Sequence, residues 1–258
     1  MTKKEIKSEY KDNLKKLKSD FRAEKKVLKA QYEKRLDEFY SSNEYKNAAN
    51  PPRRTILEEI GNAVTHGVGS VFAIVALILM LLRANSISEY IGAAVYFTGL
   101  FFMFTMSCLY HSFPYGSKVK RLFRRFDYSS IYLLIGATFT PILLCYIGGA
   151  YGIAFTSVQW AVIAAGVTFI GVFGPSRLKW LHFPLYFILG WSALIFVPKM
   201  ITDNLAFFFW ILGGGVIYTL GIIPFAIDKK VSHFLWHFFV LAGAVVQWVG
   251  IYLFIYCV

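Results

Sequence analysis

Seven long apolar stretches constrain this chain more than any other feature. A helix needs about 20 consecutive, mostly apolar residues to cross the core of a bilayer. Such stretches occupy residues 62–83, 89–112, 127–147, 152–173, 180–198, 204–226 and 231–257. The chain is 57% hydrophobic, above the roughly 45–50% of soluble domains. The sequence therefore predicts an all-α, polytopic bundle of seven transmembrane helices in the cell membrane.

The first 54 residues have a different composition. They hold 16 of the 27 Lys and Arg residues, whereas nearly everything after Asn62 is apolar. Apolar residues recur at near-helical spacing in 5–40, which predicts a charged amphipathic helix, and 41–54 has the composition of a linker. We therefore divide the chain into a basic cytoplasmic helix and linker, 1–54, and a membrane domain, 55–258. The helix either docks on a membrane or partner, or is solvated or self-associating.

Basic residues are concentrated in alternate connections between the stretches. The N-terminal tail and the loops at 113–126, 174–180 and 227–230 carry Lys and Arg, whereas the intervening loops carry few. The positive-inside rule then predicts a cytoplasmic N-terminus and a C-terminus outside. The same basic excess indicates anionic inner-leaflet lipids as partners, and not nucleic acid. The oligomeric state stays open at this stage.

Histidines provide the main candidate site. His233 and His237 lie four residues apart in the seventh stretch, a spacing that places them on one face of a helix, where both imidazoles can hold one ion. His111, at the end of the second stretch, has the same predicted membrane depth and completes a set of three. Three neutral imidazoles leave a fourth tetrahedral position for water, and imidazole favours Zn²⁺ over Mg²⁺ or Ca²⁺. Cys108 is a weaker candidate ligand.

Other polar residues fall at a similar depth. Asp127 either orients a ligand, holds the bound water or acts as general base, or else it caps a helix or pairs with a neighbouring arginine. Ser107, one turn before His111, either hydrogen-bonds the water or a substrate oxygen, or bonds its own helix backbone. We expect His66 to be an outer-shell or packing histidine. We expect His182 to anchor the membrane interface.

Five motifs together resemble the hemolysin III branch of the progestin and adipoQ receptor family. They are Glu59–His66 (EIGNAVTH), Ser107–His111 (SCLYH), Asp127–Ile131 (DYSSI), Gly136–Pro141 (GATFTP) and His233–His237 (HFLWH). Each motif alone is loose, but the set is specific and spans the membrane domain. The resemblance implies zinc near the cytoplasmic face, held by the histidines that match His111, His233 and His237. It places Ser107 and Asp127 close to that ion.

The resemblance also implies a function. The wider superfamily includes alkaline ceramidases, which hydrolyse a lipid amide, and the similar adiponectin receptors are linked to ceramide hydrolysis. The chain would then be a zinc-dependent intramembrane hydrolase acting on the carbon–nitrogen or ester bond of a membrane lipid, with Asp127 and Ser107 as catalytic residues. The sequence leaves a second interpretation open, in which the zinc is structural and the protein is a non-catalytic sensor or regulator of membrane lipids or fluidity.

Overall fold

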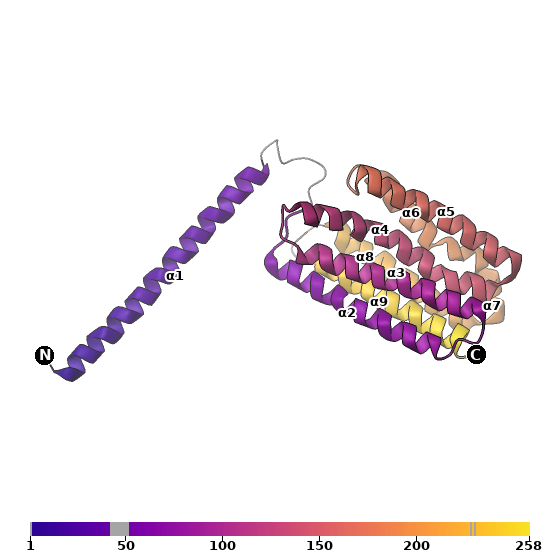
Figure 1. The fold of residues 1–258 in the computed structure, drawn as a ribbon, viewed down its shortest axis with the longest axis horizontal. Helices are drawn as coiled ribbons and strands as arrows, with labels where there is room; N and C mark the ends of the chain where they lie inside the picture. The colour runs from indigo at the N-terminus through magenta and orange to yellow at the C-terminus, as the bar shows by residue number, and fades with distance from the viewer. Residues whose placement is uncertain (1, 42–51, 228, 230) are drawn as a thin grey trace. The chain divides into compact units, whose positions relative to one another are not determined.

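Helices make up all the regular structure that the computed structural model describes, which covers residues 2–41, 52–227, 229 and 231–258. The chain divides into two units, Met1–Asn50 and Pro51–Val258. The first contains one continuous helix, α1 (Lys3–Ser41), drawn in indigo in Figure 1. The linker predicted at 41–54 falls largely on residues 42–51, which lie outside the described residues.

The second unit is a bundle of helices that run side by side (Figure 1). Its elements are α2 (Ile56–Leu81), α3 (Ile87–Ser112), α4 (Lys118–Pro141), the π-helical η1 (Ile142–Ile147), α5 (Gly149–Phe173), α6 (Lys179–Gly190), the 3₁₀-helical η2 (Ser192–Phe196), α7 (Val197–Asp203), α8 (Leu205–Ile227), α9 (Ser232–Ile251) and the π-helical η3 (Tyr252–Tyr256). The described residues contain seven helical spans long and apolar enough to cross a membrane, one of them made of α6, η2 and α7. This confirms the predicted seven-helix class.

The start of α2 lies six residues before the predicted start of its span. Thr55 caps the helix, because its side chain accepts a hydrogen bond from the backbone N–H of Glu58. In return, the Glu58 carboxylate accepts from the backbone N–H of Thr55 at 2.9 Å. This reciprocal pair satisfies two donors that the first turn would otherwise leave free. Glu59 therefore lies in the first turn of α2, although the predicted span began only at residue 62.

The start of α4 differs even more from the prediction. The helix begins at Lys118 rather than at 127, and the Ser117 hydroxyl caps it by accepting a hydrogen bond from the backbone N–H of Lys120. The predicted 113–126 loop is therefore wrong, since most of it is helical. Hydropathy located the apolar part of the span, whereas capping chemistry sets where the helix begins.

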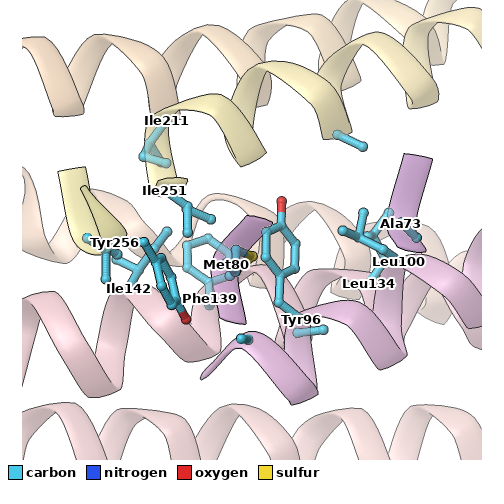
Figure 2. Packing of buried hydrophobic residues seen from close by; sticks show 14 of the residues in the cluster. Ala73, Met80, Tyr96, Leu100, Leu134, Phe139, Ile142, Ile211, Ile251 and Tyr256 are labelled. Carbon is cyan, nitrogen blue, oxygen red and sulfur yellow. The ribbon is translucent and has the colours of Figure 1, made fainter. Parts of the chain in front are cut away.

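Large apolar side chains fill the centre of the bundle. Tyr96 and Leu100 of α3 are fully buried and meet residues of α2, α4 and α9 (Figure 2). Elsewhere in the bundle, α8 packs directly against α9. A Cβ atom at Gly214 would lie 2.2 Å from Cγ of Gln247 on α9, so only glycine permits this approach. Gly214 lies within a run of three glycines, Gly213–Gly215, on α8. The packing brings the beginning of α9 to the end of α3.

Candidate metal centre

Three imidazoles from two distant parts of the chain converge. His111 lies in the last turn of α3, and His233 and His237 lie in the first two turns of α9. Nε2 of His233 lies 3.4 Å from Nε2 of His111 and 3.3 Å from Nε2 of His237. In a tetrahedral zinc site with Zn–N distances of about 2.0–2.1 Å, adjacent nitrogens are about 3.3–3.4 Å apart. Both separations fit one shared tetrahedral ion.

Burial strengthens the case for a cation at this position. The exposed fractions of His111, His233 and His237 are 2%, 9% and 1%, and one potential ligand nitrogen from each ring lies within 4.8 Å of the others. A neutral imidazole has one N–H donor and one acceptor nitrogen. When Nδ1 carries the proton in each ring, three Nε2 lone pairs face one another, and a divalent metal ion between them would satisfy all three. The cluster can hold a metal, and the identity of that metal stays a prediction.

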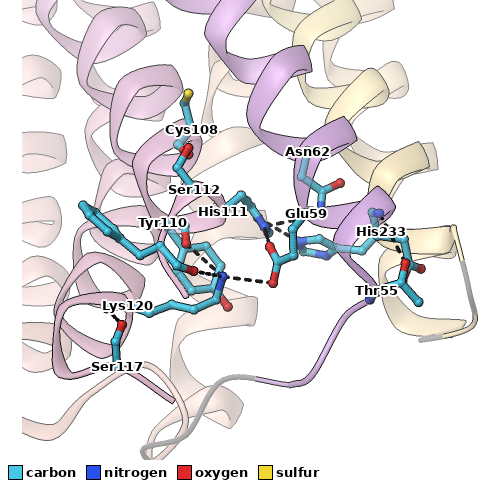
Figure 3. Close-up of polar contacts among 12 residues, drawn as sticks. Thr55, Glu59, Asn62, Cys108, Tyr110, His111, Ser112, Ser117, Lys120 and His233 are labelled. Carbon is cyan, nitrogen blue, oxygen red and sulfur yellow. Dashed lines mark hydrogen bonds and ion pairs between the residues drawn. The ribbon is translucent and has the colours of Figure 1, made fainter. Parts of the chain in front are cut away.

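Glu59 of α2 holds the His111 ring from behind. Its Oε2 lies 2.6 Å from Nδ1 of His111, on the opposite side of the ring from the cluster (Figure 3). An Nδ1–H that donates to this carboxylate leaves the lone pair on Nε2, which is the tautomer that a metal ligand requires. Metal-ligating histidines are commonly oriented by such carboxylates. Glu59 therefore fixes both the orientation and the tautomer of His111.

A buried lysine completes this contact. Nζ of Lys120 lies 2.9 Å from Oε1 of Glu59, and the lysine side chain is only 1% exposed. The same ammonium donates hydrogen bonds to the carbonyl oxygens of Tyr110 at 3.0 Å and Phe113 at 3.1 Å (Figure 3). It thereby satisfies carbonyls at the end of α3, the turn that carries His111. The pair ties the first turns of α2 and α4 to the last turn of α3.

The two predicted catalytic residues lie beside the histidines. Ser107, one turn before His111 in α3, is 1% exposed, and its side chain hydrogen-bonds the carboxylate of Asp127. Asp127 is half-buried in the third turn of α4, so the alternative of a helix cap is wrong. Neither residue belongs to the group of potential ligand atoms within 4.8 Å.

The remaining candidates have different surroundings. The His66 ring stacks on His237 with centroids 3.8 Å apart and an angle of 22° between the planes, consistent with an outer-shell or packing role. His182 is 1% exposed, and its Nδ1 lies 3.0 Å from the Tyr132 hydroxyl. Its predicted role as an interfacial anchor is wrong, because Tyr132 gives the ring a partner inside the bundle. Cys108 points away from the histidines (Figure 3) and is not in the ligand group.

A cavity of about 160 Å³ adjoins the cluster. Ser107, Asp127, His233 and His237 all contribute to its lining. Much of the remaining wall is apolar and includes Met103, Leu134, Phe139, Ile222 and Val240. The volume is roughly ten times what one water molecule needs. The cavity therefore combines polar groups with walls that suit a hydrocarbon chain.

The membrane unit also matches known proteins. A family model described as haemolysin-III related matches residues 54–248. The chain belongs to the haemolysin III family. Its relatives include Hemolysin-3 of Bacillus cereus, 35% identical over 195 residues that cover 73% of this chain and 88% of that protein. The Hemolysin-3 homolog of Bacillus subtilis (strain 168) is 33% identical over 196 residues, covering 74% and 91%.

Haemolysin III relatives also occur in animals. The monocyte to macrophage differentiation factor of Rattus norvegicus is 27% identical over 233 residues, covering 88% of this chain and 95% of that protein. Family membership and the seven apolar spans make this chain a multi-pass membrane protein. The matched region begins at residue 54 and so leaves α1 outside it.

Two functional candidates of this haemolysin III protein escaped the sequence analysis. Glu59 is part of the EIGNAVTH motif, and Lys120 lies within the predicted 113–126 loop, but neither was predicted to belong to the site. The spacing of Thr55 and Glu58 is a capping-box signal that places Glu59 in the first helical turn. The sequence offers no comparable signal that Lys120 meets this carboxylate, because their contact depends on how α2 and α4 pack.

Proposed function

We propose that this protein is a zinc-dependent membrane hydrolase that cleaves an amide bond of a lipid. An ester bond of a lipid is the second candidate. One observation carries the proposal. Asp127 and Ser107 line the same largely apolar cavity as His233 and His237. The amide or ester group of a lipid could therefore bind near the carboxylate and the histidines. The start of its hydrocarbon chain could lie against the apolar walls of the same cavity.

The residues divide the chemistry between them. His111, His233 and His237 would hold the ion, and zinc, when bound, supplies a Lewis acid that polarises a carbonyl group and activates water. As water adds to the amide carbon, the Asp127 carboxylate accepts its proton and then delivers that proton to the leaving nitrogen as the carbon–nitrogen bond breaks. The hydrogen bond from Ser107 orients the carboxylate for both transfers.

We place the centre toward the cytoplasm. Exposed Lys118 and Lys229 lie at the beginnings of α4 and α9, the end of the bundle where the histidines gather. The positive-inside rule assigns that end to the cytoplasmic side. Lys120 is buried against Glu59 and is therefore not one of the exposed basic residues at this end. The exposed basic residues would also attract anionic lipids of the inner leaflet.

An Asp127→Asn variant tests the catalytic role. Asparagine keeps the size of the side chain but cannot accept a proton, so hydrolysis should fall by about 10²–10⁴-fold, while zinc content and melting temperature stay close to those of the wild type. The measurement is fatty-acid release from ceramide and other amide or ester lipids in vesicles, by mass spectrometry. Asp203→Asn is the control, since Asp203 pairs with Lys199 and does not line the cavity.

The same assay separates catalysis from a structural metal. His111 lies in α3 and the other two histidines lie in α9, so a bound ion would fasten these two helices, as a sensor or regulator with structural zinc requires. In that case, chelation lowers the melting temperature while the zinc-loaded protein releases no fatty acid from any lipid. Such a result would refute the hydrolase, whereas an Asp127→Asn variant as active as the wild type would refute the catalytic role of Asp127.

A further inference from the structure

The helix α1 contains an internal repeat that the metal centre does not explain. Residues 7–17 (KSEYKDNLKKL), 18–28 (KSDFRAEKKVL) and 29–39 (KAQYEKRLDEF) align without a gap. Each segment begins with lysine, has an aromatic residue at its fourth position and ends in an apolar residue. Eleven residues make three helical turns at 3.67 residues per turn. Equivalent residues therefore form rows that run nearly parallel to the axis of α1 and drift slowly around it.

Lys25 interrupts one of three adjacent rows of the eleven, which otherwise hold apolar residues. We call these residues the apolar stripe: Ile6, Tyr10, Leu14, Leu17, Phe21, Leu28 and Tyr32. All of them are exposed in the structure, Tyr10 and Leu17 each at 66%. A continuous exposed apolar row on a helix marks a surface that another molecule covers. The stripe is as narrow as the seam of a coiled coil, whereas helices that lie in a bilayer surface usually have a wider apolar face.

The two sides of the apolar stripe have opposite charge. The rows on one side hold Lys7, Lys11, Lys18, Arg22 and Lys29, with Glu33 as the one acidic member. The rows on the other side hold Glu9, Asn13, Asp20, Glu24, Gln31 and Arg35. Both bilayer-facing flanks of a helix lying on anionic lipid would benefit from basic residues, and the acidic flank would be repelled. The asymmetry therefore argues against a membrane surface as the occupant.

We propose that the apolar stripe of α1 binds α1 of a second copy of this chain, in parallel and in register. Two-fold symmetry about an axis parallel to the helices places the basic flank of each copy beside the acidic flank of the other. An antiparallel pair would place like charges together along both flanks. Copies inserted in one membrane with the same orientation also carry their α1 segments on the same side of it. The 11-residue spacing predicts a right-handed supercoil.

Cysteine crosslinking of the full chain tests the parallel register. Tyr10→Cys, in a chain that carries Cys257→Ser and is reconstituted in vesicles, should form a covalent dimer with itself on mild oxidation. Ser8→Cys, which lies on the opposite side of the helix, should give little. An antiparallel pair would instead join Tyr10→Cys chains to Tyr32→Cys chains, because these positions exchange about Phe21. That result, or no dimer from Tyr10→Cys, would overturn the proposal.

Charge reversal tests whether a second copy of α1 or an anionic lipid surface covers the apolar stripe. Replacing Lys7, Lys18 and Lys29 by Glu makes both flanks acidic and should weaken self-association about tenfold, as expected from several lost ion pairs. Replacing Lys4, Lys15 and Lys26 by Glu changes the net charge equally but on rows away from the apolar stripe, and should leave the crosslinking yield unchanged. Equal loss in both variants, as for a helix held on anionic lipid by its total charge, would contradict the second copy as partner.

Discussion

A His237→Ala variant should purify without stoichiometric metal. The substitution removes the ring whose Nε2 lies 3.3 Å from that of His233, and two imidazoles hold an ion far more weakly than three. We expect the loss of affinity to exceed the roughly 10–100-fold that outer-shell substitutions cause. Chelation should lower the melting temperature of the wild type, because a bound ligand stabilises the folded state, but should leave that of the variant unchanged.

His182→Ala is the matched control for this experiment. His182 is as buried as His237, with 1% of each residue exposed, but it contacts Tyr132 and not the cluster. Both variants lose a buried imidazole, and therefore both lose packing. Only His237→Ala should lose the metal. If the two variants retain equal amounts of metal, the three histidines do not form the site.

A Glu59→Gln variant should lose both metal affinity and stability. The amide no longer holds the Nδ1–H of His111 as a carboxylate does, and we expect metal affinity to fall by about 10–100-fold. It also leaves the buried ammonium of Lys120 without its counter-charge. Removing one partner of a buried ion pair costs about 3–5 kcal/mol. Isothermal titration with zinc and thermal unfolding measure the two effects separately.

Adding Lys120→Met to Glu59→Gln distinguishes the two roles of the carboxylate. The double variant removes the unpaired charge, so part of the lost stability should return. The recovery is incomplete, since the carbonyls of Tyr110 and Phe113 lose their donor. Metal affinity should stay as low as in the single variant. Restored affinity would show that Glu59 acts only by neutralising Lys120, and that it does not orient His111.

The membrane domain was largely predictable because each span is a long apolar run, and such runs have few alternatives to a membrane helix. The starts of α2 and α4 were not. The first turn of each helix contains charged residues, which hydropathy assigns to loops, although Thr55 and Ser117 cap the two helices. Glu59 and Lys120 fall in these first turns. The misplaced helix starts hid the position of Glu59, whereas the contact of Lys120 also depends on how α2 and α4 pack.

The candidate site shows a similar division. Spacing placed His233 and His237 on one helical face, and common depth brought His111 to them. Membrane depth does not determine which ring atoms face each other, or that the Ser107 side chain contacts the Asp127 carboxylate. Both depend on side-chain packing between helices far apart in the sequence. The prediction for His182 was wrong for the same reason. Trp180 and Phe183 beside it favoured a position at the membrane interface, and the sequence does not show that Tyr132 packs against its ring.

Zinc X-ray absorption on the purified wild type, with metal content measured on the same sample, tests the central claim most directly. The three-histidine centre predicts one zinc per chain, with nitrogen neighbours at about 2.0–2.1 Å and no sulfur neighbour. A protein that neither contains nor takes up one divalent ion per chain, or a spectrum with sulfur at about 2.3 Å, would contradict it.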